Sequence, residues 1–155
     1  MARRHGAAGA ALALACALTL AGCGGDEADP SSTDPLRVTV GEEFTWNDFT
    51  VEEGWEINTV ERTMGLEDPV QSPEITGSLV NNSEEERSAL FKVVLSLDGD
   101  EKTSVNCSTQ KLVQDQSGAL LCPGLGAVMP EDYDAVTVME ISRDTGESGS
   151  DESGT

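Results

Sequence analysis

The alternation of apolar and polar side chains in residues 87–97 constrains the fold more than any other feature of the chain. One side of this segment is wholly apolar: Ala89, Phe91, Val93, Leu95 and Leu97. The other side carries Leu90, Lys92, Val94 and Ser96. A period of two places successive side chains on opposite faces of a β-strand. The segment therefore predicts a strand that buries its apolar side against a core and turns Lys92 outward.

Shorter segments repeat this pattern at residues 36–40, 75–80 and 135–141. A hairpin with its turn near residues 52–54 is predicted from the spacing of five apolar side chains. They are Trp46, Phe49, Val51, Trp55 and Ile57. Both tryptophans are interpreted as core residues rather than ligand platforms. Residues 81–83 and 98–100 have turn composition. Because no window has helical spacing, we predict an all-β fold, an antiparallel β-sandwich of about seven to nine strands.

The N-terminus has the layout of an export signal. Arg3 and Arg4 precede an apolar run at residues 10–20. This run is too short to span a bilayer, which takes about 20 residues, and it suits a secretory signal core of roughly 7–15 residues. The pair Arg3-Arg4 leaves a twin-arginine export signal open as an alternative to the general route.

A four-residue motif closes the signal: Leu20, Ala21, Gly22 and Cys23. It resembles the lipobox of bacterial lipoproteins, and the Ala- and Gly-rich signal is similar to those of actinobacterial lipoproteins. The resemblance implies that the signal peptidase recognises the first three residues. It also implies that Cys23 becomes the acylated N-terminus. Ordinary cleavage, with Cys23 as a spare thiol, is the alternative.

Composition divides the chain into four parts. Residues 1–22 are predicted as the lipoprotein signal peptide, and residues 23–35 as the acylated cysteine and a flexible acidic linker. Residues 36–141 are predicted as the β-sandwich domain, a normal size for one core. Residues 142–155 are predicted as a disordered acidic tail.

Charge excludes several classes of partner. Removal of the signal leaves seven Lys and Arg against 29 Asp and Glu, which gives a net charge of −22. Such a domain repels nucleic acid and anionic lipid head groups, so we expect no nucleic-acid partner and attachment to the membrane through the lipid anchor alone. Signal removal also takes the single histidine, His5, which excludes Ser-His-Asp and Cys-His catalysis.

Two cysteines remain in the predicted domain, Cys107 and Cys122. In an exported protein a pair of this kind predicts a disulfide. A metal site is the alternative, but no histidine and no Cys-x-x-Cys motif accompany the pair. We therefore predict a disulfide and no metal.

Two segments carry a family resemblance. Residues 75–83 end in Asn81-Asn82-Ser83, and residues 91–99 end in Asp98-Gly99. This arrangement resembles the FxLYD-type and related immunoglobulin-like domains of small bacterial lipoproteins. The resemblance implies an immunoglobulin-like sandwich that serves as an extracytoplasmic accessory or binding module, with no catalytic residues.

Three function classes remain. The favoured one is a non-catalytic binding or accessory module, lipid-anchored on the extracytoplasmic face of the cell membrane. Its partner would be an unknown protein or the cell wall, and it would use no cofactor. The alternative is weak binding of divalent cations or cationic ligands by the acidic loops at residues 84–86 and 98–101. An enzyme, such as a glycoside hydrolase with paired carboxylates, is least favoured because the domain is small.

Overall fold

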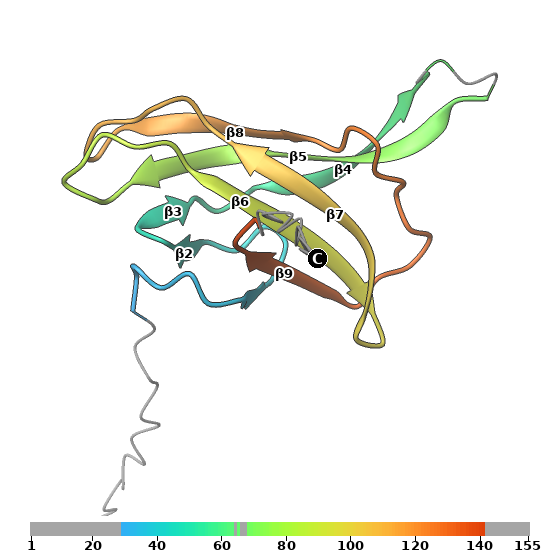
Figure 1. The fold of residues 1–155 in the computed structure, drawn as a ribbon, viewed down its shortest axis with the longest axis horizontal. Helices are drawn as coiled ribbons and strands as arrows, with labels where there is room; N and C mark the ends of the chain where they lie inside the picture. The colour runs from blue at the N-terminus through green and yellow to red at the C-terminus, as the bar shows by residue number, and fades with distance from the viewer. Residues whose placement is uncertain (1–28, 64, 66–67, 142–155) are drawn as a thin grey trace, which may run out of the picture.

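The computed structural model describes residues 29–63, 65 and 68–141, which form an antiparallel β-structure (Figure 1). Its strands are β1 (Leu36–Val38), β2 (Phe44–Trp46), β3 (Phe49–Val51), β4 (Glu56–Arg62), β5 (Val70–Asn81), β6 (Leu90–Leu97), β7 (Asp100–Ser108), β8 (Ser117–Pro123) and β9 (Ala135–Met139). Within these ranges no helix is long and apolar enough to cross a membrane. The predicted signal peptide and acidic tail lie outside the described residues.

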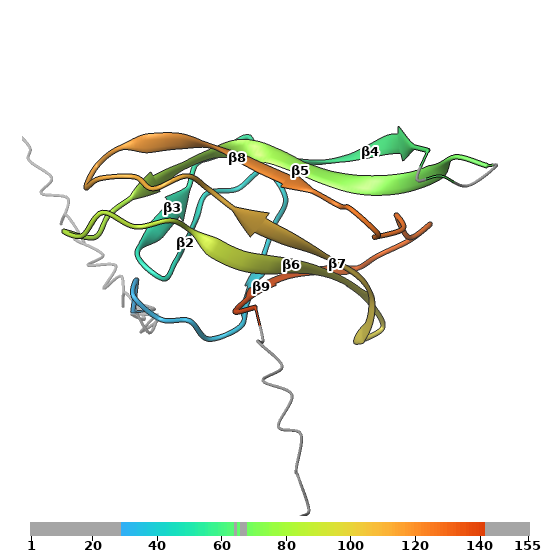
Figure 2. The same cartoon turned by 45° about the horizontal axis from the view of Figure 1, so that its top comes forward.

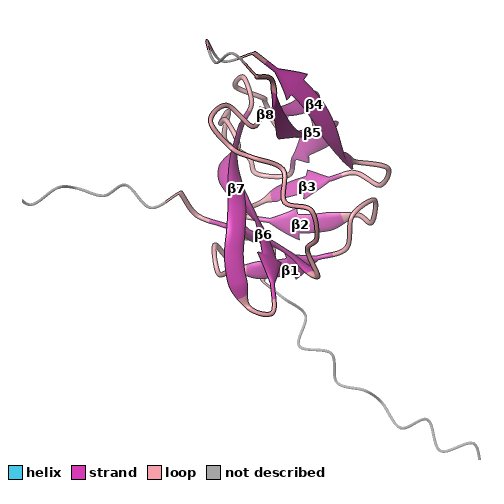
Figure 3. Ribbon diagram, turned by 90° about the vertical axis from the view of Figure 1, so that its right-hand side faces the viewer, coloured by secondary structure: helices cyan, strands magenta, loops and turns pink. Residues whose placement is uncertain are grey.

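Hydrogen bonds join the strands in the order β1-β9-β6-β7-β8-β5-β3-β2, with β4 paired to β5. The sheet folds over itself, so that β4, β5 and β8 lie in one layer and β6, β7 and β9 lie in the other (Figure 2). In the view from the side, β2, β3 and β5 follow one another opposite β6 and β7 (Figure 3). The predicted all-β antiparallel fold is confirmed, and the part of the chain that the structure describes contains nine strands.

Strand neighbours follow the immunoglobulin pattern in part. In an immunoglobulin domain strand B lies beside E in one sheet, and C lies beside F in the other. Here β5 lies beside β8, and β6 lies beside β9. The N-terminal strand β1 pairs with the other edge of β9, which is the position that the last strand holds in an immunoglobulin domain. An immunoglobulin domain has two separate sheets, whereas the two layers here are joined by the pairing of β7 with β8, called the seam below.

Strand β6 confirms the predicted alternation over most of its length. Phe91, Val93 and Leu95 are buried in the core, as is Ala89 just before the strand. Leu97 is only partly buried, because the register shifts between Leu95 and Ser96 and the chain then turns into β7. On the outer side Lys92 is partly exposed. Val94 is buried there as well, since β7 and β9 flank it on both sides.

The core lies between the two layers. Its buried members are Trp46, Phe49, Val51, Trp55, Ile75, Leu79, Ala89, Phe91, Val93, Leu95, Val105, Cys107, Leu112, Leu120, Cys122, Val136 and Val138. Trp46 meets Phe91 across the interior at a centroid distance of 5.8 Å. Trp55 meets Phe44 at 5.6 Å. Both indole N–H groups donate to carbonyl oxygens, Trp46 to Asp34 and Trp55 to Glu42, so the tryptophans are core residues as predicted.

The first hairpin turns in a different place from the prediction. β2 pairs with β3, and the turn between them is Asn47-Asp48 rather than residues 52–54. Both turn residues have positive φ, 51° and 60°, which asparagine and aspartate tolerate better than most side chains. After β3 the chain does not form a second hairpin with β3, as a turn at residues 52–54 would require. Residues 52–55 lead it to β4, which pairs with β5 instead. Asp98-Gly99 is a hairpin turn as predicted, between β6 and β7.

The long axis of the domain has two distinct ends, seen at the left and right of Figure 1. One end, here called the Arg87 end, contains the Asn47-Asp48 turn and the loops at residues 82–89 and 109–116. The other, here called the Asp98 end, contains the Asp98-Gly99 turn and the loop at residues 124–134 that leads into β9. The described chain starts at the Arg87 end, where residues 29–35 lie against β2 and β3.

Candidate functional site

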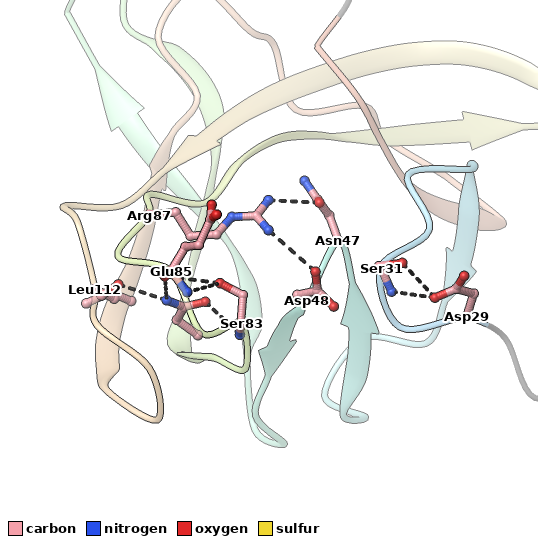
Figure 4. Close-up of polar contacts among 9 residues, drawn as sticks. Asp29, Ser31, Asn47, Asp48, Ser83, Glu85, Arg87 and Leu112 are labelled. Carbon is pink, nitrogen blue, oxygen red and sulfur yellow. Dashed lines mark hydrogen bonds and ion pairs between the residues drawn. The ribbon is translucent and has the colours of Figure 1, made fainter.

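The Arg87 end holds a polar cluster around one guanidinium group (Figure 4). The Nη2 atom of Arg87 donates to Oδ1 of Asn47 at 2.8 Å, and Nη1 lies 3.5 Å from Oδ2 of Asp48. The same guanidinium lies 5.0 Å from the centre of the Phe49 ring. These contacts fasten the β2–β3 turn to the segment that leads into β6. Arg87 is occupied by the fold and is not a free ligand-binding cation.

Asn81 is the second centre of this cluster, and its side chain is fully buried. Its Nδ2 atom donates to the carbonyl oxygens of Glu85 and Leu112, each at 2.8 Å. Its Oδ1 atom accepts from the backbone N–H of Ser83 at 3.1 Å. A buried amide that bonds to three backbone groups in two different loops holds these loops together, because each of the three bonds depends on the relative position of the loops. The Asn81-Asn82-Ser83 motif is thus structural.

The described part of the predicted linker contacts the same end. Pro30 accepts a backbone hydrogen bond from Asp48 at 2.7 Å, and Ser32 accepts one from Asn47 at 3.0 Å. Next to them, two hydrogen bonds from Ser31 to the carboxylate of Asp29 hold the pKa of that carboxyl below its ordinary value. Residues 30–34 therefore pack as an extension of the β2–β3 hairpin.

The acidic loops do not assemble a metal site among the described residues. Glu84, Glu85 and Glu86 are exposed, and the Asp98-Gly99 turn is at the opposite end of β6. Within residues 29–63, 65 and 68–141 no three Cys, His, Asp or Glu side chains come together in an arrangement that could hold a metal ion. The predicted lipobox residues Leu20, Ala21, Gly22 and Cys23 lie outside the described residues.

The predicted cysteine pair lies at the seam between the two layers. Cys107 of β7 and Cys122 of β8 form a disulfide with a Cα–Cα distance of 4.5 Å, and both are fully buried. This distance is typical of directly opposed residues in an antiparallel pair. In the described sheet, Ser108↔Leu121 is the single ladder pair between these strands.

The seam opens immediately beyond the disulfide. Alternate residues of a strand direct their backbone groups to the same edge, so Pro123 faces β7 as Leu121 does. Proline, however, has no N–H to donate to β7. The ladder therefore stops, and a groove of about 290 Å³ separates the strands. Its lining residues are Ser104, Val105, Asn106, Pro123, Gly124 and Leu125. None of them is charged.

Three exposed apolar side chains, here called the apolar lip, lie within three residues of the groove-lining segment 123–125, and one of them, Leu125, lines the groove itself. The lip consists of Leu121, Leu125 and Val128, which are 53%, 70% and 59% exposed. Gly124 sets the position of this segment, because a Cβ atom there would collide with the carbonyl oxygen of Pro73. Only glycine lets this turn approach β5 so closely.

The sequence prediction missed the groove and the lip. The sequence does contain a feature that marks this region: residues 116–130 have no charged side chain, in a chain that has 29 Asp and Glu. The exposure of the lip, however, depends on which strands become neighbours.

Comparison with known proteins adds no relative. No protein-family model matches the chain, and no curated protein or solved structure matches it.

Proposed function

We propose that this protein is a non-catalytic binding or accessory module, lipid-anchored on the extracytoplasmic face of a bacterial cell membrane. One observation carries the binding role: the apolar lip is exposed beside an uncharged groove, while the rest of the surface is rich in acids. Exposed apolar groups that are gathered in one place mark interaction sites and ligand-binding grooves. The polar cluster at the Arg87 end supports the non-catalytic part of the proposal, because its side chains bind one another and hold the loops together.

The anchor is supported by the resemblance of residues 20–23 to a lipobox. The contacts of residues 30–34 with the β2–β3 hairpin leave the short segment 24–29 between the acylated Cys23 and the domain. Six residues reach at most about 20 Å when fully extended. The Arg87 end is therefore the membrane-proximal end of the domain, and the Asp98 end points away from the bilayer.

The anchor is tested by fractionating cells that express single variants. Cys23→Ala should move the protein from the membrane fraction to the medium or leave the signal uncleaved, and it should remove the lipid mass from the N-terminal peptide. Cys16→Ala is the matched control, because Cys16 lies in the signal segment and outside the four-residue motif. Membrane attachment and N-terminal mass that survive Cys23→Ala would exclude a lipid anchor.

Weak cation binding by the acidic loops remains the alternative function. It draws on the strong negative charge and on the exposed glutamates at residues 84–86. Titration calorimetry with calcium tests it directly. Saturable heat that Glu84→Gln and Glu85→Gln abolish would favour this alternative over a protein-binding module.

A further inference from the structure

We propose that the open edge of β7 at Ser104 and Asn106, together with the apolar lip, binds an extended segment of a partner protein by strand addition. The inference rests on the proposed binding role and names its surface and the chemistry of its occupant. It does not depend on the lipid anchor, so the two are tested separately.

The backbone of β7 supplies the first argument. β7 lies beside β6 along its whole length. Because the N–H of Thr109 donates to the carbonyl oxygen of Ala89, the hydrogen-bonded pairs between the two strands are every second one: Phe91↔Cys107, Val93↔Val105 and Leu95↔Thr103. Neighbouring residues of a strand direct their N–H and C=O groups to opposite edges. Ser104 and Asn106 therefore share the edge of Ser108, which faces β8, but the ladder to β8 has ended at Pro123. An extended peptide is the ligand that satisfies such a row of alternating donors and acceptors.

The side chains supply the second argument. A strand laid along Ser104 and Asn106 enters the groove of about 290 Å³ and lies against Leu125. Proteins commonly protect exposed strand edges with charged side chains. The outer strand β4 follows this rule, since it carries Glu56, Glu61 and Arg62. The segment 103–106 of β7 carries no charge and is bordered by exposed leucines instead. This edge lacks the protection that β4 has.

Charge selects the occupant. The groove is neutral, so its centre suits apolar and hydroxyl side chains. Exposed acids flank it: Glu101 at the start of β7, where Asp100 is paired with Lys102 at 3.9 Å, and Glu131 and Asp132 after the uncharged run. A segment with apolar residues at its centre and Lys or Arg at its end is complementary to this surface. A second copy of the chain is a poor occupant, because each mature copy carries a net charge of −22.

The open edge is tested first on the mature protein alone, either acylated in detergent micelles or as the unacylated Cys23→Ala form. Amide hydrogen exchange by NMR should show protected N–H groups at Val105 and Cys107, which face β6. The N–H groups of Ser104 and Asn106 should exchange rapidly. Protection of all four amides without ligand, together with a dimer in light scattering, would assign the edge to a second copy and overturn the proposal.

Binding is tested with a nine-residue peptide of alternating valine and threonine that ends in two lysines. It should bind and slow exchange at Ser104 and Asn106 at least tenfold. The matched control peptide has proline in place of alternate valines, lacks the required N–H groups and should not bind. Equal binding of the two peptides overturns strand addition. Strand addition is also overturned if the peptide does not bind at concentrations up to about 1 mM, since a Kd of about 1 mM corresponds to a binding free energy of only about 4 kcal/mol.

Variants locate the site. Leu125→Ser should weaken peptide binding about fivefold or more, because it removes apolar surface that lines the groove. Leu90→Ser is the matched control, since Leu90 is an exposed leucine of β6 outside the groove. It should change the affinity less than twofold. Equal effects of the two substitutions would place binding elsewhere on the protein.

Discussion

Cys107 of β7 and Cys122 of β8 face each other directly beside Ser108↔Leu121, the single ladder pair of the described seam. The disulfide therefore supplies a covalent link where the sheet has least hydrogen bonding. In the immunoglobulin domains of antibodies the bridge instead crosses the core between the two sheets. Here it joins strands that are already neighbours, and it holds the edge of β7 next to the groove.

The first prediction concerns this bridge. A double substitution, Cys107→Ser with Cys122→Ser, should lower the free energy of unfolding by about 3 kcal/mol, the chain-entropy value for a loop of this length. The sequence separation of the two cysteines is 15. Urea unfolding measures the loss. The unmodified protein in reducing buffer should approach the stability of the double variant, and an unchanged midpoint in both cases would mean that the bridge does not stabilise the fold.

The second prediction concerns the register of β6. Phe91 is 2% exposed and packs against Trp46, so Phe91→Ala should cost about 3–5 kcal/mol. Lys92→Ala, one position along, should cost under about 0.5 kcal/mol, since that side chain points away from the core. The same urea titration compares them. A larger loss for Lys92→Ala would indicate a register slipped by one residue.

The alternation in β6 was predictable because it is a local property of an extended chain. Each side chain from Ala89 to Leu95 alternates regardless of which strands lie beside it. Leu97 departed from the pattern because a register shift at Leu95/Ser96 is a product of pairing with β7. The disulfide was predictable for a different reason, since only two cysteines remained once Cys16 and Cys23 were assigned to the signal and the anchor.

The first hairpin and the seam were not predictable in this way. The turn Asn47-Asp48 lacks the glycine that usually announces such a turn, whereas Gly54 drew the prediction to residues 52–54. The groove forms because Pro123 ends the ladder between β8 and β7, the strand that precedes it in the chain. The sequence shows the proline and the uncharged run, but it does not show which edge they leave open.

The third prediction concerns the buried amide at the Arg87 end. Asn81→Ala removes three hydrogen bonds to backbone groups, each with a net contribution of roughly 0.5–1.5 kcal/mol. We expect a total loss of about 2–4 kcal/mol, moderated by water that enters near the exposed Glu85. Asn82→Ala is the matched control, because its side chain is exposed and donates only to Oγ1 of Thr50. It should cost under about 1 kcal/mol. Similar losses of unfolding free energy for the two variants would show that the Asn81 side chain does not hold the two loops together.

The last prediction concerns the orientation of the domain on the bilayer and depends on the proposed anchor. In the acylated protein a single added cysteine is the only free thiol, because Cys107 and Cys122 are joined. A donor dye at Glu84→Cys labels the Arg87 end, and one at Asp100→Cys labels the Asp98 end; both positions are exposed. The eight residues of β6 separate these ends by about 27 Å.

Energy transfer to acceptor-labelled lipids in vesicles should be markedly stronger from the dye at position 84 than from the dye at position 100. The reason is that residues 30–34 fix the start of the domain against the β2–β3 hairpin, so the short segment from Cys23 brings this end to the membrane. Insertion of a long Gly/Ser linker between residues 28 and 29 is the control and should erase the difference, since it frees the domain to turn. Equal transfer from both positions without the insertion would show that the contacts of residues 30–34 do not orient the domain. Loss of vesicle binding altogether would instead count against the anchor.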